Sequence, residues 1–207
     1  MDIKTANFVS EFATRESGSE KIIEGYFIVY NQQTEIYRNF FEEIRAGACA
    51  ESLVTNDVCA LYNHNNSFIM GRKSAGSLTL RDDSYGVFGI VRVNSNDTEA
   101  LNVYERVKRG DIRGCSFGFL PEVEEYQELD KNVVKCVVKK ANVREISICP
   151  FPAYPQTQIS ARQQGFLEYR NRIDFLYKKE KLKEMLNNEN INNSKRIKGT
   201  SVSKFSG

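Results

Sequence analysis

The chain has 207 residues, of which 41% are hydrophobic, and its 29 basic and 27 acidic residues leave a net charge of +2. This composition suffices for one domain with a substantial core and excludes a wholly disordered chain. The charge balance does not favour a nucleic-acid partner, since no run of Lys and Arg marks a groove-binding surface. There is no long apolar run and no apolar segment near Met1, so we expect neither a membrane span nor a signal peptide.

The cysteines are scattered and odd in number, and none forms a Cys-x-x-Cys pair: Cys49, Cys59, Cys115, Cys136 and Cys149. Such spacing favours reduced, mostly buried thiols over a disulfide framework or a zinc site. The chain also has a single histidine, His64, which cannot build a His-rich metal site. We therefore expect no metal and no cofactor.

The first part of the chain predicts short strands separated by turns. Residues 22–30 are β-branched and aromatic, which is typical of a strand. Residues 58–62 form a second apolar run, which ends at the loop signal Asn63-His64-Asn65-Asn66. Residues 77–81 and 87–91 flank a turn and predict a hairpin.

A helix is predicted over about 97–109. Its buried face would be a stripe of apolar residues at helical spacing: Ala100, Val103, Tyr104 and Val107. Asn96 and Glu99 have capping-box spacing, and Gly110 marks the end of the helix.

Further strands follow up to the prolines at 150, 152 and 155. Residues 122–128 and 133–138 should pair around the turn 130–132, and 142–148 should form the last strand. The predicted organisation is a β-rich domain over 1–160, an amphipathic helix over 161–186 and a disordered polar tail over 187–207.

Ser116 is the first candidate for chemistry. Strand alternation places it on one face with two glycines, and sends the apolar side chains to the other face: Cys115, Phe117 and Phe119. An exposed hydroxyl between residues without side chains would leave room for another backbone to approach. A nucleophile that attacks a peptide needs that clearance.

His64 could take the proton from such a serine, and a carboxylate could hold the imidazole in the required tautomer. We assign that third role to Glu145, because alternation turns Ile146 and Ile148 toward the core and Glu145 away from it. If its strand is a neighbour of the Ser116 strand, the carboxylate and the hydroxyl share one surface. The sequence alone leaves that adjacency open.

Each of these residues also has an ordinary structural interpretation. Ser116 could be a small polar residue on a solvent face, His64 an exposed loop histidine, and Glu145 a solvated strand charge paired with Arg144 or a nearby lysine. Cys115 is a rival nucleophile, although alternation turns it inward as an inert thiol. On these residues alone, both a serine hydrolase and an inert β-rich domain stay open.

The order of several segments resembles the prohead (head maturation) proteases of tailed bacteriophages, which are relatives of herpesvirus assemblin. The matching segments are 25–30, 43–48, 61–65 with 70–72, 107–119, and 144–148 with 152–155. This resemblance implies a mainly β fold with α (α+β), an assemblin-like closed or partly closed β-barrel with surrounding helices and a C-terminal helix. It carries the catalytic roles onto Ser116, His64 and Glu145. The chain departs from the family at two positions. The family often has an acidic residue after the histidine, where this chain has Asn65, and it usually has a proline where this chain has Ala46.

By this resemblance the protein is a serine endopeptidase that acts inside the immature capsid (prohead) in the host cytoplasm. Its substrates would be the scaffold, or the scaffold-like segment of the major capsid protein, and the protease itself. A second copy of the chain is a further candidate partner. The alternative is a non-enzymatic capsid scaffolding protein that keeps a protease-like barrel. An esterase is disfavoured, because no Gly-x-Ser-x-Gly elbow links a strand to a helix.

Overall fold

The computed structural model describes residues 4–9, 12–17, 20–130 and 133–151, together with Phe175, Lys178, Lys179, Lys181 and Lys183. The chain divides into two compact units, 1–162 and 163–207. In the second unit the five described residues are helical and exposed. The rest of the predicted helix over 161–186, and the predicted tail over 187–207, lie outside the described residues. No helix in the described part of the chain is long and apolar enough to cross a bilayer.

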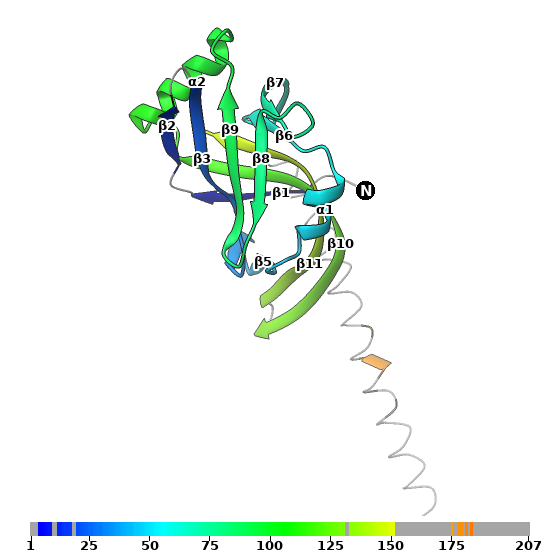
Figure 1. The fold of residues 1–207 in the computed structure, drawn as a ribbon. Helices are drawn as coiled ribbons and strands as arrows, with labels where there is room; N and C mark the ends of the chain where they lie inside the picture. Colours follow the sequence, from blue (N-terminus) through cyan, green and yellow to red (C-terminus); the bar gives the residue numbers. More distant parts are fainter. Residues whose placement is uncertain are drawn as a thin grey trace, which may run out of the picture. The chain divides into compact units, whose positions relative to one another are not determined.

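The described residues form mainly strands with two helices (Figure 1). The elements in chain order are β1 (Lys4–Val9), β2 (Ala13–Ser17), β3 (Glu20–Val29), β4 (Thr34–Tyr37), β5 (Phe40–Ile44), α1 (Ala50–Thr55), β6 (Cys59–Tyr62), β7 (Asn65–Arg72), β8 (Leu78–Asp82), β9 (Gly86–Val93), α2 (Thr98–Arg109), β10 (Gly114–Asp130) and β11 (Val133–Cys149). The predicted hairpin of residues 77–91 is confirmed as β8 and β9. The four separate strands expected between 114 and 148 merge into the two long strands β10 and β11.

The strands make two sheets rather than a closed barrel. The larger has seven strands in the order β1-β10-β11-β5-β4, with β6 and β7 added beside β11; the smaller has four, in the order β2-β3-β9-β8. Closure of a barrel requires hydrogen bonds that join its first and last strands. No strand pairing joins these two sheets among the described residues, so the expectation of a closed barrel is wrong.

The core lies where the two sheets face each other, and their strands run across one another in Figure 1. Cys115 on β10 donates its thiol hydrogen to the carbonyl oxygen of Tyr26 on β3, at 3.4 Å. A Cβ on Gly89 of β9 would lie 2.6 Å from the Phe27 ring and 3.3 Å from Ile146 Cδ1. A glycine at 89 therefore allows the sheets to approach this closely.

Helix α2 has the predicted buried stripe and ends at Gly110, whose φ of 85° is left-handed. The N-cap, however, is Asp97 and not Asn96. The Asp97 carboxylate accepts hydrogen bonds from the backbone N–H groups of Glu99 and Ala100, at 3.0 and 3.1 Å. An aspartate satisfies these amides and also carries a charge that the helix N-terminus favours.

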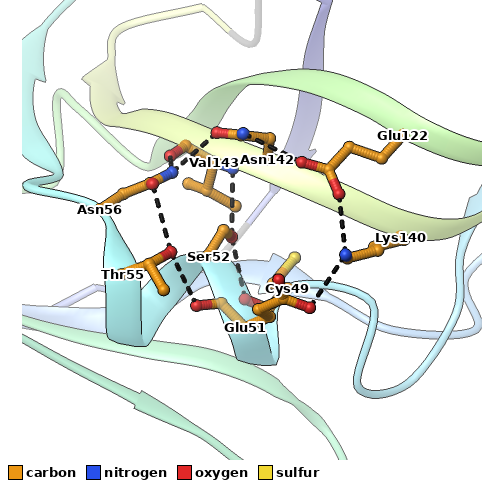
Figure 2. A network of polar contacts seen from close by, with 9 residues as sticks. All are labelled: Cys49, Glu51, Ser52, Thr55, Asn56, Glu122, Lys140, Asn142 and Val143. Atoms are coloured by element: carbon orange, nitrogen blue, oxygen red, sulfur yellow. Dashed lines mark hydrogen bonds and ion pairs between the residues drawn. The ribbon is translucent and has the colours of Figure 1, made fainter.

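Helix α1 is held on β11 by a network of polar contacts (Figure 2). The Ser52 hydroxyl donates to the carbonyl of Cys49 at 2.9 Å and accepts from the backbone N–H of Val143 at 3.2 Å. The Asn56 amide donates to Asn142 Oδ1 and to the Val143 carbonyl, at 2.7 and 2.8 Å. These bonds satisfy buried backbone groups of β11 that its neighbouring strands do not reach.

Candidate active site

His64 stands in a two-residue turn between β6 and β7. Asn63 and His64 have φ values of 52° and 58°, and the flanking residues Tyr62 and Asn65 are paired. Two consecutive left-handed residues are the mark of a type I′ hairpin turn, in which glycine is preferred at the second position. Here a histidine takes that position. The loop predicted at 63–66 is therefore a tight turn that projects His64 from a fixed backbone.

The structure brings His64 and Glu145 together, although 81 positions separate them in sequence. The Nδ1 atom of His64 lies 2.8 Å from Oε1 of Glu145. Parallel pairing of β6 with β11 produces this contact, since it sets Cys59 beside Glu145 and Tyr62 beside Ile148. An ionised carboxylate only accepts hydrogen bonds, so it places the proton on Nδ1. The Nε2 atom is then the basic nitrogen, and it is buried without a hydrogen-bond partner among the described residues.

Ser147 is a residue that the sequence analysis did not single out. Its hydroxyl donates to Glu145 Oε2 at 2.7 Å and accepts from the backbone N–H of His64 at 3.1 Å. The side chain is fully buried. A serine two residues after the predicted acid, on the same strand face, was the only signal available in the sequence.

Ser116 lies on β10 directly opposite Ser147 on β11, and Gly118 lies opposite Glu145. Opposed residues of an antiparallel pair point to the same face, so the hydroxyl and the carboxylate share one surface. The sequence left open whether the strands of Ser116 and Glu145 are neighbours, and the structure shows that they are. The structure does not join Ser116 to His64 Nε2 by a hydrogen bond.

The expectation that Ser116 is exposed is wrong, because its exposed fraction is 0%. Alternation identifies which face a residue occupies, but not whether that face is covered. Strand β10 is also paired on both edges, with β11 on one side and with β1 on the other, where Asn7 stands opposite Ser116. The predicted inward direction of Cys115 is confirmed by its contacts with β3.

A β-bulge lies beside Glu145. Gly118 pairs with Glu145 and the next residue, Phe119, pairs with Val143, so Arg144 is the extra residue. The bulge explains why Val143 and Ile146, three positions apart, are both fully buried. Bulges change the direction of side chains near functional sites. This one gives Glu145 its place over Gly118.

Gly118 leaves the space that the Glu145 carboxylate occupies. A Cβ at position 118 would lie 2.5 Å from Glu145 Oε1 and 3.1 Å from its Cγ. If Glu145 has the role that the resemblance implies, Gly118→Ala should push the carboxylate off His64 and lower turnover about 100-fold or more, the cost of misplacing such a group by roughly 1 Å. The measurement is turnover per folded molecule. Gly71→Ala is the control, since its Cβ would meet Ser77 O at a crowded 3.0 Å but would touch neither His64 nor Glu145. Unchanged turnover in Gly118→Ala would contradict the expectation.

One group of potential metal ligands occurs in the described part of the chain: Glu42, Glu124 and Cys136, with ligand atoms within 4.8 Å of one another. Glu124 already forms an ion pair with Lys4, and its carboxylate accepts a hydrogen bond from the Cys136 thiol at 3.4 Å. Burial raises the pKa of the Cys136 thiol well above its ordinary value, so the sulfur keeps its proton. A protonated thiol does not suit a cation. The group is also eight residues along β10 from Ser116, away from His64.

A family model described as "Caudovirus prohead serine protease" matches residues 10–172, a range that includes His64, Ser116, Glu145 and Ser147. The chain belongs to this family. The resemblance found in the sequence is thereby confirmed, and the protein is a member of a serine protease family of tailed phages.

The chain is similar in sequence to one phage protease and in fold to another, whose structure has been solved. The prohead protease of Enterobacteria phage HK97 is 25% identical over 163 residues, which cover 77% of this chain and 68% of the HK97 protein. The solved structure of the bacteriophage T4 capsid assembly protease, gp21, is 13% identical with a TM-score of 0.47, and the match covers 71% of this chain and 94% of gp21.

Proposed function

We propose that this chain is the serine endopeptidase of prohead maturation, with Ser116 as nucleophile, His64 as general base and Glu145 as the residue that orients His64. The observation that carries the proposal is the contact between His64 Nδ1 and Glu145 Oε1 at 2.8 Å, on the strand next to that of Ser116. That contact leaves Nε2 as the nitrogen able to accept the proton of a serine hydroxyl.

The reaction would follow the ordinary course of acyl transfer. Ser116 Oγ attacks the peptide carbonyl carbon while His64 Nε2 takes the hydroxyl proton, and the resulting imidazolium gives that proton to the leaving amine. Water then hydrolyses the acyl-enzyme with His64 again as base. Glu145 keeps its charge throughout and stabilises the imidazolium across the 2.8 Å contact. Catalytic hydrogen bonds such as Ser116 to His64 often tighten only when substrate is bound.

Access to Ser116 requires a movement, since the residue is fully buried. Strand β1 is the segment paired along the edge of β10 at Ser116. An extended peptide that added to a sheet edge would be held by backbone hydrogen bonds of the same kind as those that now hold β1. The substrates proposed for this site are the scaffold, or the scaffold-like segment of the major capsid protein, inside the prohead of the infected host cell.

Intact-mass measurement of purified protein treated with a fluorophosphonate probe tests the proposal. We expect one adduct per wild-type chain and none in Ser116→Ala. Self-cleavage between the predicted helix and the C-terminus would also give a shorter species that is absent from the Ala variant. Labelling that persists in Ser116→Ala would contradict the assignment.

The alternative of a non-enzymatic capsid scaffolding protein predicts the opposite outcome. Such a protein would show neither the adduct nor the shorter species, even in preparations that assemble with capsid protein. The ordered His64–Glu145 contact favours the enzyme, since a packing role gives no reason to place a partly buried imidazole against a carboxylate.

A further inference from the structure

The backbone at His64 is held in a conformation that a histidine adopts at a cost. A left-handed residue other than glycine is disfavoured by about 1 kcal/mol or more, because Cβ approaches the carbonyl oxygen. Two backbone N–H groups of this turn donate to β11: Asn63 N–H to the Ile148 carbonyl at 3.0 Å, and His64 N–H to Ser147 Oγ at 3.1 Å. The second contact comes from a side chain, so a single substitution removes it.

The hydrogen bonds around Ser147 have a fixed direction. Its oxygen accepts from the His64 backbone N–H, and its own hydrogen goes to Glu145 Oε2 at 2.7 Å. The other carboxylate oxygen of Glu145 faces His64 Nδ1 at 2.8 Å. A closed ring therefore runs from the His64 backbone through Ser147 and Glu145 to the His64 side chain.

We propose that Ser147 is a positioning residue, which holds the His64 turn and the Glu145 carboxylate in one arrangement and so fixes the proton on Nδ1. This proposal rests on the proposed function, in which Nε2 must be free to act as the base. Ser147 binds one oxygen of Glu145, so the carboxylate can turn only its other oxygen toward the imidazole. The resulting tautomer leaves Nε2 without a proton.

The same contacts show why Ser147 is not itself the nucleophile. Its hydroxyl hydrogen is donated to Glu145, on the Nδ1 side of the imidazole, whereas the base lies at Nε2. Ser116, which lies opposite Ser147 on the neighbouring strand, keeps the nucleophile role that the proposed function gives it. Two buried serines that stand opposite each other thus have different roles.

The single histidine of the chain makes the test direct, because all imidazole signals belong to His64. The full chain carrying Ser116→Ala, which prevents self-cleavage, is labelled with nitrogen-15, and the imidazole tautomer is measured by NMR. We expect the Nδ1–H tautomer to dominate, and Ser147→Ala to shift the population toward Nε2–H. Ser147→Cys, close in size but a much weaker hydrogen-bond donor, gives the same readout if the Ala variant does not fold.

Ser52→Ala is the matched control. Like Ser147, Ser52 is a buried serine whose hydroxyl accepts from one backbone N–H, that of Val143, and donates to a second group, the Cys49 carbonyl. These bonds involve neither His64 nor Glu145. We expect it to lower the unfolding temperature as Ser147→Ala does and to leave the tautomer unchanged. In the active chain, Ser147→Ala should lower kcat roughly 10- to 100-fold, the effect of losing a hydrogen bond to a charged group.

An undiminished Nδ1–H population in Ser147→Ala, or an equal shift in Ser52→Ala, would overturn the positioning role. Failure of the proposed function is a separate result, because it would appear as absence of Ser116-dependent cleavage. The tautomer measurement decides the role of Ser147 in either case.

Discussion

Replacement of Ser116 by alanine should abolish processing of the proposed capsid substrate while the fold is kept. Loss of a triad nucleophile removes about 10⁶-fold in turnover, since the residual rate comes only from binding and charge stabilisation. The change deletes one buried oxygen atom, so it should lower the free energy of unfolding by only about 1–3 kcal/mol. The measurement is cleavage of the major capsid protein on co-expression, together with a thermal unfolding curve.

Cys115→Ala is the matched control for that experiment. Cys115 is the neighbour of Ser116 on β10, but its thiol faces the carbonyls of Tyr26 and Phe27 in the core. The variant should therefore process the substrate at close to the wild-type rate. Processing that survives in Ser116→Ala and is lost in Cys115→Ala would make the cysteine the nucleophile and refute our assignment.

The second large effect concerns His64 and Glu145 as a coupled pair. We expect His64→Ala to lose about as much turnover as Ser116→Ala, and Glu145→Ala to lose less, roughly 10⁴-fold. In the proposed function, Glu145 affects catalysis through the 2.8 Å contact with His64 Nδ1. The double variant should therefore be no slower than His64→Ala alone.

The measurement is a double-mutant cycle on turnover, with the three variants purified and their folded fractions compared. Arg144→Ala serves as the control, because Arg144 is the exposed bulge residue beside Glu145 on the same strand. Losses that multiply in the double variant would mean that Glu145 acts independently of His64, for example as a strand charge.

Local pattern was enough to identify several of the elements and the inward face of some of them. Alternation in 114–119 correctly turned Cys115 inward, and the helical stripe of α2 is buried as its spacing predicted. Such patterns depend on neighbours in the chain, whose geometry is set by strand and helix periods of 2 and 3.6 residues. The family resemblance also rested on local segments, and the match to the family model confirms it.

Tertiary structure alone decided how the candidate site is assembled. Pairing of β10 with β11 and of β11 with β6 brings residues far apart in sequence together, and no local pattern encodes that register. The bulge at Arg144 arises from the same pairing and shifts the alternation between Val143 and Glu145, whereas Ile146 and Ile148 face the core as predicted. Burial of Ser116 likewise depends on what covers its face, which strand alternation does not report.

Residue types and their spacing were thus enough to show which chemical groups are available: one histidine, a serine between glycines, and an acid on the last strand. The link that Ser147 makes between the His64 backbone and the Glu145 carboxylate, and the space that Gly118 leaves for that carboxylate, became visible only in the folded chain. Hydrogen-bond direction and steric clearance are properties of atoms brought together by long-range strand pairing, and a linear pattern specifies neither.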